Sequence, residues 1–365
     1  METYPIPMVP GPVQVPEEIL QAYQKNYGAP GLEEEFLALY HDTEQHLQQI
    51  LGTQNRVVIQ TGEGMLALWT ALRSCLSPGD RVLSIATGVF GYGIAGMAES
   101  IGAEVNTIGL EYDETLADLS AVADAVESFR PKMITVVHCE TPSGTLNPLE
   151  GLGRLKHDAG VPLLYADVVS SAGGVPVAVD AWHVDLALGG SQKCLSAPPC
   201  MAFLSVSDRA WSEIARTGYV GYDALAPFRN LEAAGRFPYT PYWHGMSALN
   251  TAAKRLTAPG LEESFRRHAE AAEHCRKEMA GMGLALFPAP EAVPSPTVTA
   301  AWVPEPIGWT EFDARLRRRG LVVGGSHGKL ARRVFRIGHM GSQADMDLLG
   351  KALSILAEVG GSAAA

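Results

Sequence analysis

The sequence has few of the features that mark a membrane protein or a partner of nucleic acid. Its 28 Lys and Arg residues are outnumbered by 40 Asp and Glu, which gives a formal net charge of -12, and no basic run occurs. Nucleic acid is therefore not expected as a partner. No apolar stretch approaches the length that spans a bilayer, and the N-terminus lacks the charged and apolar regions of an export signal. We expect a cytoplasmic protein that does not use a membrane.

The sequence also lacks paired cysteines. Its five cysteines are widely spaced and show no C-x-x-C pattern of a zinc site: Cys75, Cys139, Cys194, Cys200 and Cys275. Reduced thiols and the absence of a metal centre are therefore the expectation. With 365 residues and 47% hydrophobic content, the chain is long enough for one large core and a smaller second domain.

Short β-rich runs alternate with helix-like stretches between residues 56 and 207. The runs span residues 56–60, 81–86, 133–138, 162–166, 184–188 and 202–206. Between the first two, residues 64–76 predict an apolar helix that stops before the turn sequence at 77–80. This alternation predicts an α/β fold with a mostly parallel sheet, of the seven-stranded type, flanked by helices.

The pattern changes after residue 259. Residues 261–282 predict one long charged amphipathic helix, and shorter runs follow at 297–303 and 321–323. We therefore expect three parts, namely an N-terminal segment (1–20), a large ligand-binding domain (21–258) and a smaller C-terminal α/β domain (259–365).

Two polar residues stand directly behind apolar runs. Asp167 closes one run, and Lys193 follows the next within residues 189–199. An amine that attacks a carbonyl has to be held rigidly, and a pyridine ring that it captures needs a carboxylate on its protonated nitrogen. Ligands bind at the carboxyl ends of the strands in such sheets, so we expect both residues at one ligand site.

Glycine and hydroxyl residues follow the other strands, at 61–64, 87–91 and 139–148. At these positions the chain resembles the class V aminotransferases of fold type I, and the resemblance extends from Pro10 to Gly341. Its most specific motifs are the segment 140–148, the D-x-x-x-S-x-G-G pattern at 167–174, and Ser191-Gln192-Lys193. The resemblance implies a homodimer or homotetramer with a shared active site and small-molecule substrates, including a 2-oxo acid.

The resemblance also implies a role for each matching residue. Lys193 would form a Schiff base with a pyridoxal-type ring and move protons, while Asp167 would bind the ring nitrogen. The other implied roles are ring stacking by Phe90, a hydrogen bond to the ring hydroxyl from Thr141, a clamp on the substrate carboxylate by Arg336, and phosphate binding by Gln192 and, from a neighbouring subunit, Thr240.

The turn at 61–65 departs from most of this family, which places small polar residues around a phosphate at a helix N-terminus. Here Glu63 and Met65 flank Gly64, so a carboxylate stands where the phosphate would lie. Two such charges roughly 4 Å apart would repel by several kcal/mol. The sequence motifs resemble those of a branch of the family in which unphosphorylated pyridoxamine gives its amino group to pyruvate, forming pyridoxal and L-alanine. We expect Glu63, Gly64 and Met65 to bind this unphosphorylated ring.

Several alternatives stay open on the sequence alone. Gln192 is retained, which leaves room for pyridoxal 5'-phosphate and for an enzyme of alanine-glyoxylate or serine-glyoxylate type. Glu63 also suits a first helical turn, where it complements the helix dipole by roughly 0.3 to 1 kcal/mol. His327 matches a second arginine of the pyridoxamine branch, near the substrate carboxylate, so the preferred keto acid is open.

Two other classes of function are disfavoured. Residues 62–67 match the dinucleotide pattern G-x-G-x-x-A, but the strand at 81–86 is not followed by the acidic residue that would hold a ribose. A protein that only binds the vitamer without catalysis would not need both Lys193 and Asp167.

Overall fold

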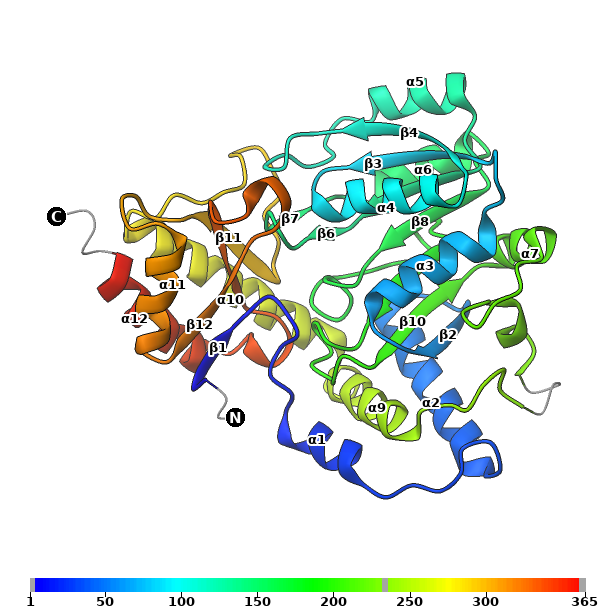
Figure 1. The fold of residues 1–365 in the computed structure, drawn as a ribbon, viewed down its shortest axis with the longest axis horizontal. Helices are drawn as coiled ribbons and strands as arrows, with labels where there is room; N and C mark the ends of the chain where they lie inside the picture. The colour runs from blue at the N-terminus through cyan, green and yellow to red at the C-terminus, as the bar shows by residue number, and fades with distance from the viewer. Residues whose placement is uncertain (1–3, 232–235, 361–365) are drawn as a thin grey trace.

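The computed structural model describes residues 4–231 and 236–360, and helices surround two main sheets in this part of the chain (Figure 1). The larger of them is seven-stranded over the described residues. Its spatial order is β2 (Arg56–Thr61), β10 (Met201–Val206), β9 (Leu186–Gly190), β8 (Leu163–Asp167), β5 (Met133–Val137), β3 (Arg81–Ala86) and β4 (Glu104–Gly109). Neighbouring strands are parallel except at β10, which is antiparallel to both β2 and β9. The α/β sheet predicted from the sequence is confirmed.

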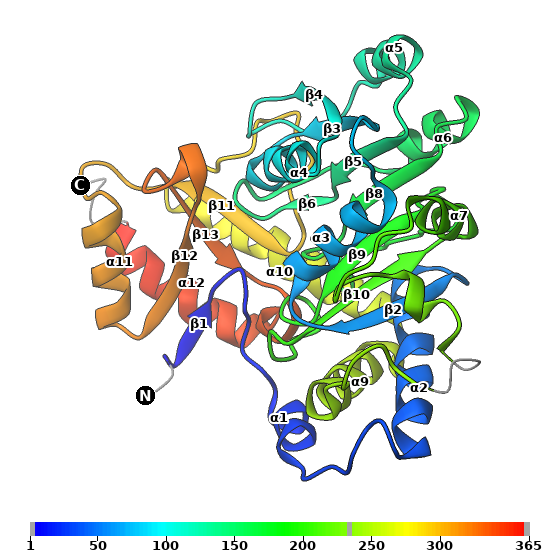
Figure 2. The same ribbon diagram turned by 45° about the vertical axis from the view of Figure 1, so that its right-hand side comes forward.

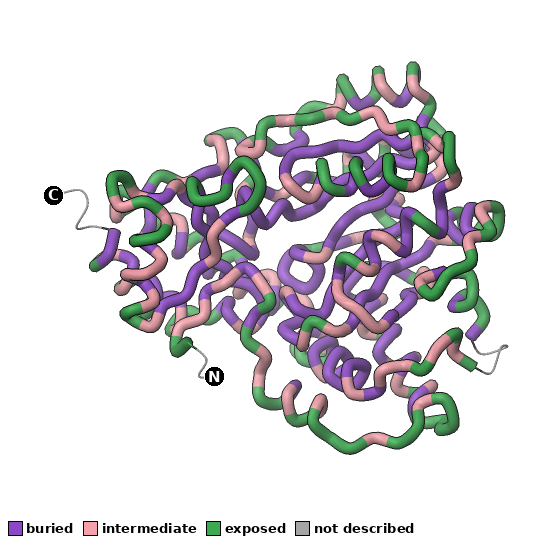
Figure 3. The backbone as a smooth tube through the Cα atoms, in the orientation of Figure 1, coloured by how far each residue is buried: buried purple, intermediate pink, exposed green. Residues whose placement is uncertain are grey.

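The central strands of this sheet are covered on both faces. Strands β5, β8 and β9 are buried along their whole length, which explains their continuous apolar sequence. Figure 3 shows the buried sheet inside and the exposed turns of the helices outside. The helices of this part are α1 (Glu17–Gln24), α2 (Glu34–Leu51), α3 (Gly64–Cys75), α4 (Val89–Ser100), α5 (Ser120–Phe129), α6 (Glu150–Asp158), α7 (Asp208–Thr217), the 3-10 turn η1 (Ala226–Phe228) and α9 (Trp243–Thr257).

The smaller sheet has the order β1 (Ile6–Met8), β12 (Leu321–Gly325), β13 (Val334–Gly338) and β11 (Val298–Trp302). Its companions are α10 (Leu261–Gly281), α11 (Trp309–Arg318), α12 (Met346–Gly360) and the turns η2 (Gly328–Leu330) and η3 (Gly341–Gln343). Strand β1 runs parallel to β12, as Figure 2 shows. The first residues of the chain are thus part of this sheet, and the chain then crosses to α1 beside α9.

Three strands of the two main sheets, β1, β4 and β13, have no counterpart among the predicted runs. Strand β4 pairs with β3 at the sheet edge and is half exposed, so its sequence Glu-Val-Asn-Thr-Ile-Gly contains no apolar run. Strand β13 is buried but carries Arg336 in its middle, which interrupts the apolar pattern. The long helix predicted at 261–282 is present as α10, and the outer limits 1–3 and 361–365 of the expected domains lie outside the described residues.

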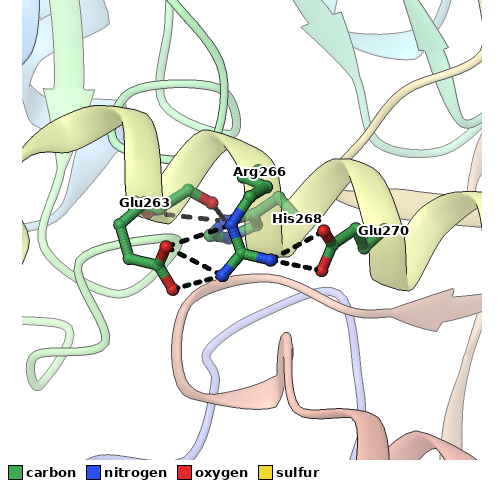
Figure 4. A network of polar contacts seen from close by, with 5 residues as sticks. Glu263, Arg266, His268 and Glu270 are labelled. Carbon is green, nitrogen blue, oxygen red and sulfur yellow. Dashed lines mark hydrogen bonds and ion pairs between the residues drawn. The ribbon is translucent and has the colours of Figure 1, made fainter.

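Helix α10 has one exposed charged face and one buried face. On the exposed face Arg266 bonds to Glu263 and Glu270, as Figure 4 shows, and such surface pairs contribute little stability. On the buried face, the Nε2 atom of His268 accepts a hydrogen bond from the Gly341 N–H at 2.8 Å. Burial lowers the pKa of His268 to about 4, so the neutral ring ties α10 to the turn η3 behind β13.

Candidate active site

Lys193 lies in the turn that joins β9 to β10. The turn is closed by backbone hydrogen bonds from Ser191 N to Met201 O (3.0 Å) and from Ala197 N to Ser191 O (2.9 Å). The half-buried Lys193 donates from Nζ to the carbonyl oxygen of Pro10 at 2.6 Å. Loss of water, and then the charge of Arg336, lower the pKa of the Lys193 amine. The site therefore raises the share of neutral, nucleophilic amine.

Asp167 ends β8, which is the strand next to β9, so both residues reach the same edge of the sheet. Its Oδ1 atom accepts a hydrogen bond from Val169 N at 2.8 Å. Burial raises the pKa of Asp167 to about 6, although the Val169 bond and Lys193 act in the opposite direction. A cationic group bound beside Asp167 would stabilise its ionised form.

A cavity of about 140 Å³ lies between Lys193 and Asp167. Pockets for drug-sized ligands typically measure about 300 to 1,000 Å³, so this one suits a single small ring. Seven of the predicted site residues line it together: Glu63, Gly64, Met65, Phe90, Asp167, Gln192 and Lys193. A larger groove of about 770 Å³ lies at the amino ends of the strands and contains none of the predicted residues.

Glu63 caps the N-terminus of α3. Its Oε1 atom accepts a hydrogen bond from Met65 N at 3.1 Å, and its Oε2 atom accepts one from Gln192 Nε2 at 2.9 Å. The other end of the Gln192 amide, Oε1, is buried and has no hydrogen-bond partner among the described residues. A Cβ at Gly64 would lie only 2.9 Å from Val169, so glycine permits close packing here. Two donors at this end of the cavity, the Met65 N–H and the Gln192 amide N–H, are thus engaged by Glu63.

Phe90 stands in the first turn of α4, at the wall of the cavity. The buried carboxylate of Glu140 accepts hydrogen bonds from Phe90 N at 3.2 Å and Gly91 N at 2.7 Å. Burial raises the pKa of Glu140 to about 7, although these two bonds lower it. A Cβ at Gly88 would lie 2.6 Å from this carboxyl carbon. Glu140 therefore fixes the helix turn that presents Phe90.

Arg336 projects from β13 and is almost fully buried. Its Nε atom donates to Gly325 O at 2.9 Å, and its terminal nitrogen lies 3.2 Å from Nε2 of His327. Burial lowers the pKa of Arg336 to about 10. Partial burial, followed by Arg336 and Lys193, lowers the pKa of His327, so its neutral ring can accept from the guanidinium. No carboxylate pairs with Arg336 among residues 4–231 and 236–360.

Besides Arg336 and His327, two further predicted residues do not line the cavity. Thr141 is buried in the turn between β6 (Cys139–Glu140) and β7 (Thr145–Leu146), where Ser326 Oγ donates to Pro142 O at 2.7 Å. Thr240 is exposed on the chain that precedes α9. The expected roles of both residues stay predictions.

Several residues at the site were not assigned by the sequence. Cys139 lines the cavity, as do Leu68, Val169 and Ser170. The Pro10 carbonyl meets Lys193, but a main-chain acceptor leaves no signal in residue type. The sequence signal nearest to this contact is the glycine at position 11. In the structure Gly11 has a φ of +96°, and a Cβ there would lie only 2.6 Å from Cδ of Lys193.

No cluster of three or more His, Cys, Asp or Glu side chains able to hold a metal ion occurs among the described residues. Within the same part of the chain, every helix is too short or too polar to cross a membrane.

Comparison with known proteins identifies the family. The family model described as aminotransferase class-V matches residues 9–329. The pyridoxamine–pyruvate transaminase of Mesorhizobium japonicum is 31% identical over 93% of this chain and 87% of its own, and the alanine–glyoxylate aminotransferase of Oryctolagus cuniculus is 32% identical over 96% and 91%. The crystal structure of pyridoxamine-pyruvate aminotransferase from Mesorhizobium loti superposes with a TM-score of 0.93 at 30% identity, covering 100% of this chain and 94% of that one. The chain therefore belongs to the class-V aminotransferase family.

Proposed function

We propose that the protein is a transaminase that moves an amino group from pyridoxamine to pyruvate and releases pyridoxal and L-alanine. The class-V family depends on pyridoxal phosphate, so the second candidate is an alanine-glyoxylate or serine-glyoxylate type of enzyme that keeps this phosphate ester bound. The similarity to alanine–glyoxylate aminotransferases and the retained Gln192 support this second, phosphate-binding candidate. The Glu63 carboxylate lies at the helix N-terminus where a phosphate would bind, and this position supports the pyridoxamine–pyruvate reaction.

The hydrogen-bonding groups near Glu63 fit a hydroxymethyl group better than a phosphate. The Met65 N–H and the Gln192 amide N–H already donate to Glu63. The free group is an acceptor, Gln192 Oε1, beside a carboxylate. A phosphate dianion brings acceptors and negative charge, whereas a hydroxymethyl group brings an O–H donor. An unphosphorylated ring would avoid the repulsion by the Glu63 carboxylate.

The residues in and near the cavity would have the following roles in this reaction. When bound, the pyridine ring would supply a sink for the electron pair left on the carbon that loses its proton. Asp167 holds a proton on the ring nitrogen, and Phe90 covers one ring face. Lys193 Nζ moves a proton between C4' of the vitamer and the α-carbon of the keto acid, as general base and then general acid. Arg336 binds the keto acid carboxylate, and Thr141 bonds the ring hydroxyl.

The decisive experiment compares the binding of pyridoxamine and pyridoxamine phosphate to protein that was purified without added vitamer. We expect a colourless protein after dialysis that binds pyridoxamine more tightly than pyridoxamine phosphate and converts it with pyruvate to pyridoxal. Absorption spectra and an alanine assay measure both steps. A yellow protein that retains the phosphate ester through dialysis would favour the second candidate.

Replacing Glu63 by serine is expected to change the ratio of the dissociation constants of pyridoxamine and pyridoxamine phosphate. The change should be at least about 100-fold in favour of pyridoxamine phosphate. The reason is that a like charge worth several kcal/mol at this distance is removed. Titration calorimetry with both vitamers measures the ratio. Glu63→Gln is the matched control, because its amide oxygen still caps α3 without the charge and should shift the ratio in the same direction. An unchanged ratio in both variants would leave Glu63 as a helix cap alone.

Replacing Arg336 by glutamine is expected to raise the KM for pyruvate about 100-fold, while the dissociation constant of pyridoxamine changes little. Hydrogen bonds to a charged group are worth about 1.5 to 3 kcal/mol each, and a carboxylate would lose two of them. Initial-rate kinetics and a vitamer titration separate the effects. Arg336→Lys keeps the charge but not the planar fork, so its KM for pyruvate should lie between those of the wild-type protein and Arg336→Gln. Equal losses for vitamer and keto acid would contradict the clamp.

We further propose that the protein acts in the cytoplasm as a homodimer or homotetramer. Thr240 supports this assembly, because it is exposed and does not line the cavity of its own subunit. A neighbouring subunit would bring its copy to the site. Sedimentation velocity of the wild-type protein measures the assembly state.

A further inference from the structure

Residues 9–13 form a strap that crosses from the small sheet to the turn of Lys193, and we call it the N-terminal strap. At its start, Val9 O accepts a hydrogen bond from Gln343 Nε2 at 2.7 Å. At its end, Val13 N donates to Gln192 O at 3.1 Å. The strap is therefore fixed to the small domain on one side and to the residue before Lys193 on the other.

The middle of the strap lies directly on the Lys193 side chain. Pro10 O accepts from Lys193 Nζ at 2.6 Å, and a Cβ at Gly11 would lie 2.6 Å from Cδ and 2.7 Å from Nζ of the same lysine. Contacts this short mean that any side chain at Gly11 would displace either the strap or the amine. Gly11 also has a φ of +96°, which other residues adopt only with strain.

We propose that the N-terminal strap positions Lys193, with the Pro10 carbonyl oxygen holding the amine whenever no ligand is joined to it and Gly11 permitting this approach. The inference rests on the proposed function, in which the ring leaves as pyridoxal and the amine has to be held for the next ring. A neutral carbonyl suits this task, because it orients the amine without a charge that would compete with Asp167 for the ligand.

The charged and titratable groups around Lys193 define what the strap adds. Burial and Arg336 favour the neutral amine, whereas Cys139, Cys194 and Asp167 favour the ammonium. The strap itself has no titratable side chain. Its carbonyl also favours the ammonium, since hydrogen bonding to a charged form stabilises that form. Losing this bond should therefore make the amine neutral at a lower pH.

The test replaces Gly11 by alanine and uses Gly260→Ala as the matched control. Gly260 has nearly the same φ, +94°, but its Cβ would meet no atom within 4 Å. We expect the midpoint pH for bond formation between the ring aldehyde and Lys193, followed by absorbance, to fall by about one unit in Gly11→Ala and to stay unchanged in Gly260→Ala. Turnover should fall by about 10- to 100-fold because the amine is displaced. Both pyridoxal and pyridoxal phosphate are used as probes.

A second variant guards against a Gly11 variant that does not fold. A Cβ at Gly324 would lie 2.6 Å from Cδ of Pro10 without touching Lys193, so Gly324→Ala should push the strap and lower the midpoint in the same direction. A midpoint unchanged in Gly11→Ala and Gly324→Ala, or shifted equally in Gly260→Ala, would overturn the proposal. If the wild-type protein binds only the phosphate ester, the proposed vitamer fails, while the midpoints read with that ester still decide the strap.

Discussion

Alanine in place of Lys193 is expected to lower transaminase turnover by about 10⁴-fold. The change removes the only amine that lines the described cavity, and with it both the nucleophile and the carrier of the proton. General acid–base catalysis alone contributes about 10²- to 10⁴-fold, so the loss should reach the upper end of that range. Binding of pyridoxamine should change far less, because Asp167 and Glu63 are retained.

Single-turnover absorbance with pyridoxamine and pyruvate measures this loss. Lys351→Ala is the matched control, since Lys351 is an exposed lysine on α12 and should leave turnover unchanged. Borohydride added to the wild-type protein with pyridoxal should fix the ring on the peptide that contains Lys193, and small primary amines should partly restore the alanine variant. Full turnover in the alanine variant would refute the assignment.

The sequence predicted those parts of the site that depend on strand ends. Asp167 and Lys193 follow buried apolar runs, and a parallel sheet brings the carboxyl ends of adjacent strands together, so their proximity required no knowledge of side-chain packing. The turn at Glu63 was predictable for the same reason, because it joins β2 to α3. By contrast, β4 was missed because an exposed edge strand needs no apolar run.

The sequence could not predict contacts between elements that lie far apart along the chain. The bond from Gln192 to Glu63 spans two loops and leaves the opposite end of the amide without a partner. The Pro10 carbonyl reaches Lys193 from the segment that follows β1, a strand of the other sheet. Such contacts depend on how the two sheets are placed, and main-chain acceptors have no residue type that a pattern could reveal.

Asparagine in place of Asp167 is expected to lower turnover by about 10²- to 10³-fold. Removing one partner of a buried charge pair costs about 2 to 5 kcal/mol, and the ring nitrogen would lose the group that keeps it protonated. Steady-state kinetics measure the loss. A pyridoxal methylated on its ring nitrogen keeps its charge without Asp167, so the variant should be less impaired with this analogue. Equal impairment with both rings would contradict the role in ring protonation.

The same substitution is expected to stabilise the ligand-free protein at alkaline pH. Because burial raises the pKa of Asp167 from 3.8 to about 6, its ionised form costs up to about 3 kcal/mol above pH 6, and this cost disappears as the pH falls toward 4. The melting temperature of Asp167→Asn should therefore exceed that of the wild-type protein at pH 8, with a smaller difference at pH 5. Saturating pyridoxamine should favour the wild-type protein, whose carboxylate then gains a cationic partner. The expected melting-temperature advantage of the ligand-free variant over the wild-type protein is larger at pH 8 than at pH 5. A smaller advantage at pH 8 would show that Asp167 is not held in a site built for a cation.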